Sequence, residues 1–245
     1  MWKTLRYILV DFAIVLYTFI LGSLVIFLSW IPRLPGHIAK LWAWLILRTA
    51  GVKIEVTGLD NRKPHTPYVF MSNHMSHFDV LSLLSILPPE VRFLAKKELV
   101  RIPVFGWALY AMGHIIVDRG NQPEAFRSID EGAKRVREGV PVLVFAEGTR
   151  SPNGTLQAFK KGGFVLAIKA GVDILPISIS GSREVLPKGS LRVNPGKIRV
   201  VLSKPIPSSE HTLEKKERLM ERVRAAIEAG LHIPLQHQEN PVSPK

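Results

Sequence analysis

The chain has 245 residues, with 33 lysine and arginine against 20 aspartate and glutamate residues, a formal charge of +13. Apolar residues make up 47% of the chain, enough to bury a sizeable core, which excludes a chain disordered throughout. The absence of cysteine excludes disulfides, cysteine-ligated metals and a cysteine nucleophile. The positive charge indicates an anionic partner, and no basic run is interleaved with aromatic residues, so a lipid surface or an acidic protein is favoured over nucleic acid.

The N-terminal region is predicted to attach the chain to a membrane. Residues 8–30 are almost wholly apolar, with Asp11 as the one charge, and approach the ~20 residues that cross a bilayer. Basic residues precede this stretch, and Trp30 and Arg33 follow it, as is typical of interfacial anchors. The alternative for this stretch is a buried core helix.

A second apolar helix is predicted at residues 37–50, after Pro32 and Pro35. The two helices could form a membrane-embedded helical pair that enters one leaflet and returns, or the first could be a true span. Basic residues on both sides leave the orientation open. We therefore expect residues 1–50 to be a membrane-anchoring helical module.

Beyond residue 51, short β-rich runs alternate with helical patterns, which predicts an α/β fold with a mixed, largely buried sheet flanked by helices. The predicted strands are 52–57, 68–72, 91–95, 114–117, 142–145, 174–178 and 198–202. The predicted helices are 80–87, 104–112, 123–138, 163–170 and 209–229, the last with a cap at Ser209 and a stop at Gly230. We expect a catalytic domain at residues 51–233 and a flexible tail at 234–245.

The first chemical cluster is NHMSHFD at residues 73–79, between a predicted strand and a predicted helix. Ser76 could cap the helix, with Asp79 in its first turn as an acidic variant of the capping box. His74 would then lie in the loop before the helix, where Asp79 could accept from one imidazole nitrogen and leave the other as a base. Such a dyad suits proton abstraction from a hydroxyl.

Two other interpretations of this cluster stay open. The His-x₄-Asp spacing can arise by chance, with Asp79 a cap and His74 an ordinary loop residue. His74, His77 and Asp79 could also contribute to a metal site, although the remaining histidines lie in unpromising contexts and we expect no metal.

The second cluster is EGTRSPNG at residues 147–154, directly after the predicted strand 142–145. Arg150 offers a planar fork of donors that fits phosphate oxygens, and Gly148 allows close backbone approach. Glu147 could instead pair with Arg150 to hold the loop, and an ordinary turn with a surface salt bridge is the alternative. The chain contains no phosphate-binding glycine motif of the nucleotide-binding types and no Gly-x-Ser-x-Gly.

Together these segments resemble the glycerolipid acyltransferase family, most closely the members that acylate 1-acyl-glycerol-3-phosphate. The resemblance covers about residues 50–205, and its motifs stand in the family's order: NHMSHFD (73–79), FLAKKEL with IPVFG (93–106), GHIIVDR (113–119), EGTRS (147–151) and VDILPI (172–177).

The resemblance implies roles for particular residues. His74 would be the general base, oriented by Asp79, that deprotonates the 2-hydroxyl of lysophosphatidate for direct attack on an acyl thioester. The implied phosphate site comprises Arg150, Lys96, Glu147, Gly148 and Thr149, and the further candidates are Asn73, Ser76, Arg119 and Lys160. His77 falls where the motif is variable and receives no role.

The resemblance also implies partners: lysophosphatidate as acceptor, acyl-CoA or acyl carrier protein as donor, and membrane phospholipid, with no cofactor and no nucleic acid. We expect attachment to a bacterial inner membrane with the catalytic domain on the cytoplasmic face. The alternatives are a different lysophospholipid or amino-lipid acceptor, metal-dependent hydrolysis, and a non-catalytic membrane protein that binds anionic lipid.

Overall fold

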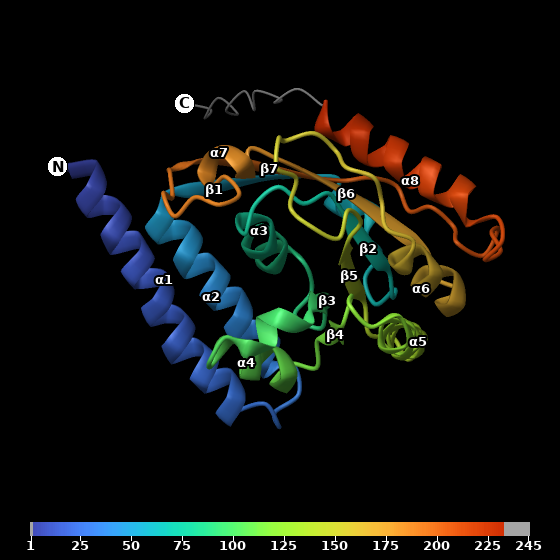
Figure 1. Cartoon of the computed structure of the whole chain (residues 1–245), viewed down its shortest axis with the longest axis horizontal. Coiled ribbons are helices and arrows are strands. Elements are labelled where there is room, and N and C mark those ends of the chain that lie inside the picture. Colours follow the sequence, from blue (N-terminus) through green and yellow to red (C-terminus); the bar gives the residue numbers. More distant parts are fainter. Residues whose placement is uncertain (1, 233–245) are drawn as a thin grey trace, which may run out of the picture.

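Seven strands form one sheet in the computed structural model, which describes residues 2–232 (Figure 1). Their order across the sheet is β1-β7-β6-β2-β5-β3-β4. The β6–β7 pair is antiparallel, and the other pairs are parallel. The strands are β1 (Val52–Thr57), β2 (Val69–Ser72), β3 (Arg92–Lys96), β4 (Ile115–Val117), β5 (Val142–Phe145), β6 (Ile174–Ser180) and β7 (Gly196–Leu202).

Helices cover both faces of this sheet. The α-helices are α1 (Trp2–Phe27), α2 (Leu34–Ala50), α3 (Phe78–Ile86), α4 (Phe105–Ala111), α5 (Gln122–Arg137), α6 (Gly162–Ala170), α7 (Ser182–Val185) and α8 (Lys216–Leu231). Two short 3₁₀ helices complete the described elements, η1 (Leu59–Asn61) and η2 (Lys97–Arg101). The predicted mixed α/β sheet flanked by helices is therefore confirmed.

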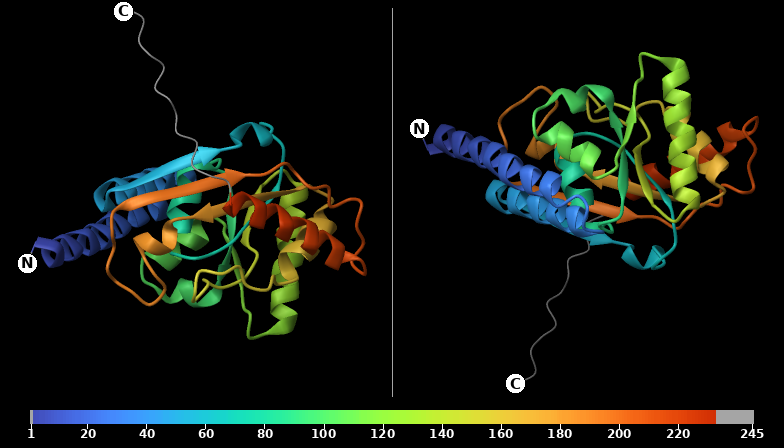
Figure 2. Two further views of the ribbon diagram at one scale, coloured as in Figure 1. Left: turned by 90° about the horizontal axis from the view of Figure 1, so that it is seen from above. Right: turned by 90° about the horizontal axis from the view of Figure 1, so that it is seen from below.

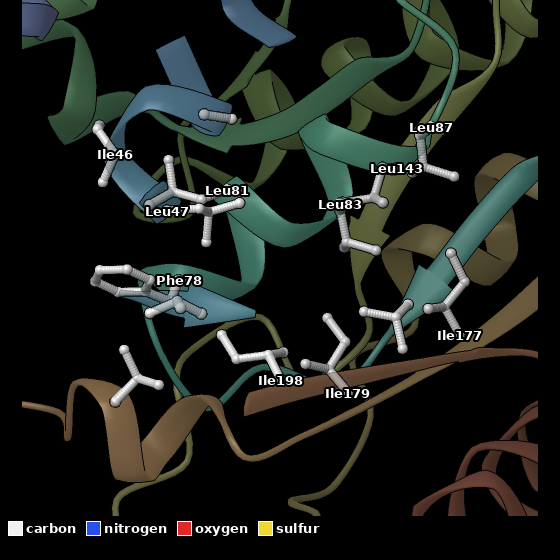
Figure 3. Packing of buried hydrophobic residues seen from close by; sticks show 14 of the residues in the cluster. Ile46, Leu47, Phe78, Leu81, Leu83, Leu87, Leu143, Ile177, Ile179 and Ile198 are labelled. Atoms are coloured by element: carbon white, nitrogen blue, oxygen red, sulfur yellow. The ribbon is translucent and has the colours of Figure 1, made fainter. Parts of the chain in front are cut away.

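Two separate apolar clusters hold the layers together. On one face, α2 and α3 pack against the sheet through side chains such as Leu47 and Phe78, which share a buried cluster with Ile198 of β7 (Figure 3). On the opposite face, α5, α6 and α8 pack around residues such as Phe164 (Figure 2). Because both faces are covered, β2 and most of β6 are buried along their length, which explains why they are nearly continuous apolar runs in the sequence.

All seven predicted strands are present, with ends within two residues of those predicted. The predicted start of the last helix is wrong, because α8 begins at Lys216 and Ser209 does not cap it. The preceding Ser208 hydroxyl donates to the carbonyls of Ala167 (3.0 Å) and Val172 (2.6 Å). These bonds hold the chain against α6, and the following turns carry it to the start of α8. The expected tail at 234–245 lies outside the described residues.

The two N-terminal helices lie side by side and pack on the rest of the chain (Figures 1 and 2). Arg6 of α1 donates to the carbonyls of Ala50 (2.7 Å) and Val193 (3.0 Å). The outer side of α1 is exposed and apolar, and residues Thr4–Phe27 are long and apolar enough to cross a membrane, with an 18-residue window whose mean hydropathy is 2.3. Contacts of α1 and α2 with later parts of the chain therefore cross the predicted domain boundary at residue 50.

The close approach of α2 to the loop before β3 generates a stability prediction. A Cβ on Gly36 would overlap the carbonyl oxygen and carbonyl carbon of Pro89. We expect Gly36→Ala to destabilise the protein by about 1–3 kcal/mol through overpacking. The unfolding midpoint in detergent should therefore fall by roughly 2–12 °C.

Gly120→Ala is the matched control, because a Cβ there would meet Asp118 Oδ1 at an ordinary 3.4 Å. Equal midpoints for the two variants, measured by thermal unfolding, would contradict the tight packing of α2 on this loop.

Candidate active site

The parallel strands bring distant parts of the sequence to one edge of the sheet. Strands β4, β3, β5, β2 and β6 are adjacent in the sheet and run parallel to one another, so their carboxyl ends share an edge. His74 follows β2, the EGTRS loop follows β5, Lys96 ends β3 and Arg119 follows β4. In open α/β sheets this edge is where ligands bind.

The predicted pair is present in the loop between β2 and α3. His74 Nδ1 lies 2.8 Å from Asp79 Oδ2, and the Asp79 side chain is fully buried. The same oxygen accepts from the backbone N–H groups of Met75 (2.6 Å) and Ser76 (2.8 Å). Because Nδ1 is bound to Asp79, Nε2 is the imidazole nitrogen left to act on a substrate.

The capping prediction for Ser76 is confirmed only in part. The Asp79 carboxylate reaches back to the Ser76 N–H, as in a capping box. The Ser76 hydroxyl, however, accepts from Phe78 N (3.2 Å) rather than from Asp79 N, and it donates to the carbonyl of Leu186 (2.8 Å). Because α3 begins at Phe78, Ser76 does not cap the helix in the predicted way. Its hydroxyl instead ties the loop that carries His74 to the segment after α7.

Three further contacts fix the position of His74. The imidazole stacks on the ring of Phe145, with centroids 3.8 Å apart and planes 14° apart. The His74 backbone N–H donates to Glu147 Oε1 (2.7 Å), and its carbonyl accepts from Ser151 N (2.8 Å). The side chain is 15% exposed, so a substrate can reach the ring. The stacking on Phe145 and the two backbone hydrogen bonds hold the ring and its loop in place.

Glu147 is buried and supports the loop that carries His74. Besides His74 N, its carboxylate accepts from Gln157 N through Oε2 at 2.8 Å. Burial raises the pKa of Glu147, and the two backbone hydrogen bonds oppose that rise. With both oxygens bound to backbone N–H groups, Glu147 is placed to hold two loops together, an arrangement that favours a supporting role over direct contact with a phosphate.

Cationic side chains gather around Gly148. Arg119 Nη1 donates to the Gly148 carbonyl. A Cβ on Gly148, whose φ is +71°, would lie 3.1 Å from Lys160 Cγ and 3.5 Å from Arg119 Nη1. Only glycine fits this conformation without strain, so the cations can approach the loop backbone closely.

Arg150 lies close enough to His77 to affect its titration. The pKa of His77 is lowered to about 4, mainly because the surrounding protein removes part of its solvation, and the positive charge of Arg150 adds to this shift. His77 is therefore neutral near pH 7, although its side chain is solvent-accessible. Thr149 is exposed in the same loop.

Two of the predicted site residues have other partners. Lys96, at the end of β3, forms an ion pair with Glu98 (3.1 Å), and both side chains are about half exposed. Asn73 is fully buried, and its amide group exchanges two hydrogen bonds of 2.8 Å with the backbone of Ile179. Asn73 thus joins the end of β2 to β6 and supports the loop that carries His74.

Two contacts of this region were not predicted from the sequence. Phe145 was assigned only to a predicted strand, where an aromatic residue usually indicates core packing. Lys188, in the segment after α7, donates to the Arg150 carbonyl (2.8 Å), and nothing in its sequence context signals this contact. Among residues 2–232, no group of three or more His, Asp or Glu side chains is arranged to hold a metal ion.

The site thus combines an imidazole hydrogen-bonded to a buried carboxylate with cationic side chains around the neighbouring loop. The general model of the acyltransferase family matches residues 53–180. The chain belongs to this family.

Curated relatives carry a more specific name. A 1-acyl-sn-glycerol-3-phosphate acyltransferase of Chlamydomonas reinhardtii is 31% identical over 216 residues, 86% of this chain and 63% of that protein. A chloroplastic protein of the same activity from Brassica napus is 38% identical over 178 residues, 72% of this chain and 51% of its own. One from Pseudomonas aeruginosa is 34% identical over 194 residues, 75% of this chain and 74% of its own. The chain thus spans between half and two-thirds of the first two relatives.

A solved structure is similar over nearly the whole chain. The 1-acyl-sn-glycerophosphate acyltransferase PlsC from Thermotoga maritima superposes with a TM-score of 0.79 at 26% identity, covering 93% of this chain and 94% of that one.

The stacking of His74 on Phe145 generates a kinetic prediction. Phe145→Leu keeps an apolar side chain but removes the flat surface under the imidazole, so the ring gains freedom to leave its position. We expect kcat to fall about tenfold to a hundredfold with little change in either KM, because misplacement of a reacting group weakens the transition state.

Phe145→Tyr retains the stacking surface and should keep most of the activity, with steady-state kinetics as the measurement for both variants. Equal losses in the two variants, or a loss confined to KM, would contradict a positioning role for the ring.

Proposed function

We propose that this protein transfers a fatty acyl group from a thioester donor to the 2-hydroxyl of 1-acyl-glycerol-3-phosphate, giving phosphatidate. The observation that carries the proposal is the His74–Asp79 dyad at the same sheet edge as the EGTRS loop and the cationic side chains around it. The names of the curated relatives support this choice of acceptor.

The chemistry follows from which imidazole nitrogen is free. His74 Nε2 accepts the proton of the 2-hydroxyl as the hydroxyl oxygen attacks the thioester carbonyl carbon. The C–S bond then breaks, and the departing thiolate receives the proton from the imidazolium. Asp79 keeps the ring in the required tautomer and stabilises the imidazolium that forms. Because the chain has no cysteine, no acyl group is held on a protein thiol. The attack that we propose on the donor is direct.

The acceptor phosphate would be bound by the cations near the EGTRS loop. Arg150 supplies the forked donor, Arg119 and Lys160 flank Gly148, and Lys96 lies at the end of β3. Release of Lys96 from Glu98 would be needed before it could contact a phosphate. Gly148 and Thr149 would shape the loop backbone.

A lipid acceptor requires access to a membrane. The exposed apolar face of α1 and the net charge of +13 both support attachment to an acidic lipid surface. We propose that residues 1–50 anchor the protein to the bacterial inner membrane with the catalytic domain on the cytoplasmic side, where acyl-CoA and acyl carrier protein are the candidate donors.

The base assignment is tested with His74→Ala. Loss of the general base should lower kcat by about 10²–10⁴ without unfolding the protein. The purified enzyme is incubated with lysophosphatidate and either acyl-CoA or acyl carrier protein, and phosphatidate formation is measured beside the variant.

Each outcome of this assay decides one part of the proposal. Full activity of the variant would remove His74 from the mechanism. Wild-type product formed from another lysophospholipid or an amino-lipid, but not from lysophosphatidate, would reassign the acceptor. The donor that supports turnover identifies the thioester used.

The phosphate site is tested with Arg150→Gln, which keeps hydrogen-bonding capacity but removes the charge. A hydrogen bond between charged groups contributes about 1.5–3 kcal/mol. The KM for lysophosphatidate should therefore rise roughly tenfold or more. Arg222→Gln is the control, because Arg222 of α8 pairs with Glu210 (3.2 Å), and α8 packs on the face of the sheet opposite to α2 and α3. A rise in the donor KM alone would contradict this assignment.

A further inference from the structure

The segment from η2 to α4 exposes large apolar side chains that the catalytic site does not use. Trp107 is 59% exposed, Tyr110 58% and Ile102 47%. Trp107 and Tyr110 are three residues apart on a helix and therefore lie on the same side of α4. Gly106 and Ala108 of the same helix are buried.

This segment is continuous with the apolar surface of α1. A Cβ on Gly22 of α1 would lie 2.8 Å from Val104 Cγ1, at the start of α4. Val25 of α1 shares a buried cluster with Ala108 and Met112, so the two helices pack directly (Figure 1). The exposed apolar side chains of α1 are Leu5, Ile8, Leu9, Phe12, Val15, Leu16, Phe19, Ile20, Leu24 and Phe27.

The chemistry of the exposed side chains favours lipid as the occupant. Tryptophan and tyrosine have an apolar body and a polar tip, and they are enriched where a protein meets the membrane interface. Arg101, at the end of η2, is exposed and can meet anionic headgroups. A surface of this kind beside an exposed apolar helix fits a bilayer better than a protein partner.

The position of the segment links it to the active site. η2 begins directly after Lys96, the last residue of β3, at the sheet edge that also carries His74. The segment from η2 to α4 therefore starts at the catalytic edge, and lipid in contact with this segment is close to that edge.

We propose that η2 and α4 form a second membrane-contact segment, in which Ile102, Trp107 and Tyr110 enter the phospholipid interface and bring the catalytic edge to the lipid surface. The inference rests on the proposed attachment through α1 and extends it to a segment outside the N-terminal pair. The acceptor can then pass from the bilayer to His74 without leaving the interface.

The absence of cysteine allows the segment to be probed at single sites in the full chain. Tyr110→Cys is labelled with an environment-sensitive fluorophore, bimane, and bound to vesicles of phosphatidylglycerol and phosphatidylethanolamine that contain a nitroxide-labelled lipid. Phe19→Cys on α1 reports attachment of the N-terminal helix, and Arg222→Cys on α8 reports a surface expected to stay in water.

We expect the labels at 110 and 19 to be quenched by the nitroxide and the label at 222 to keep its fluorescence. Quenching at 19 without quenching at 110 would overturn the inference and leave attachment through α1 standing. No quenching at either position would remove both, whereas the acyl transfer itself is judged separately by the assay with lysophosphatidate.

A second measurement separates lipid contact from a structural role of these side chains. In the double variant Trp107→Ser and Tyr110→Ser, turnover of a long-chain acceptor embedded in vesicles should fall severalfold. Turnover of a short-chain acceptor dissolved as monomers should be unchanged. An equal loss on both acceptors, or no loss on either, would contradict the proposal.

Discussion

The hydrogen bonds of the buried Asp79 carboxylate are the interactions on which the loop that carries His74 depends. Moving a charge out of water is costly unless hydrogen bonds replace the lost solvation. One oxygen, Oδ2, accepts from the His74 ring and from two successive backbone N–H groups, at Met75 and Ser76. Asp79 also lies in the first turn of α3, where the helix dipole favours a negative charge. The loop must therefore fold around the carboxylate, and this folding sets the direction of the imidazole.

A second buried carboxylate completes the restraint from the opposite side. Glu147 comes from the loop after β5, and it binds the backbone of the same His74 that Asp79 binds through its ring. A positive charge on the His74 ring would thus be near two carboxylates in a partly buried setting, where electrostatic attraction is stronger than in water. The rise in the pKa of Glu147 caused by burial is opposed by its two backbone hydrogen bonds, so the burial cost is partly offset by the contacts that define the site.

Much of this organisation could be predicted from the sequence because it depends on local patterns. The central strands are buried on both faces and therefore appear as continuous Val, Ile, Leu and Phe runs, and the His74–Asp79 contact spans only one loop. The stacking of Phe145 on His74 could not be predicted, because it depends on how β5 lies beside β2. The hydrogen bond of Lys188 to Arg150 depends in the same way on where the segment after α7 lies. The Ser209 cap was wrong for a similar reason: tertiary hydrogen bonds of Ser208 to Ala167 and Val172 outweigh a local capping preference.

The N-terminal pair shows how a compositional boundary can differ from a packing boundary. Residue 50 separates an apolar region from the sheet in the sequence, yet polar side chains of the apolar helices bond across it. Arg6 donates to Val193, Tyr7 to Asn194 (3.0 Å), and Lys40 to the carbonyl of Leu87 (2.7 Å). These bonds anchor α1 and α2 to the loops around the sheet, while the outer side of α1 keeps its apolar residues exposed. A helix pair fixed in this way would hold the catalytic edge at a defined orientation to any bilayer that α1 enters. Much of the orientational cost of bringing a lipid hydroxyl to His74 would then be met before the acceptor binds.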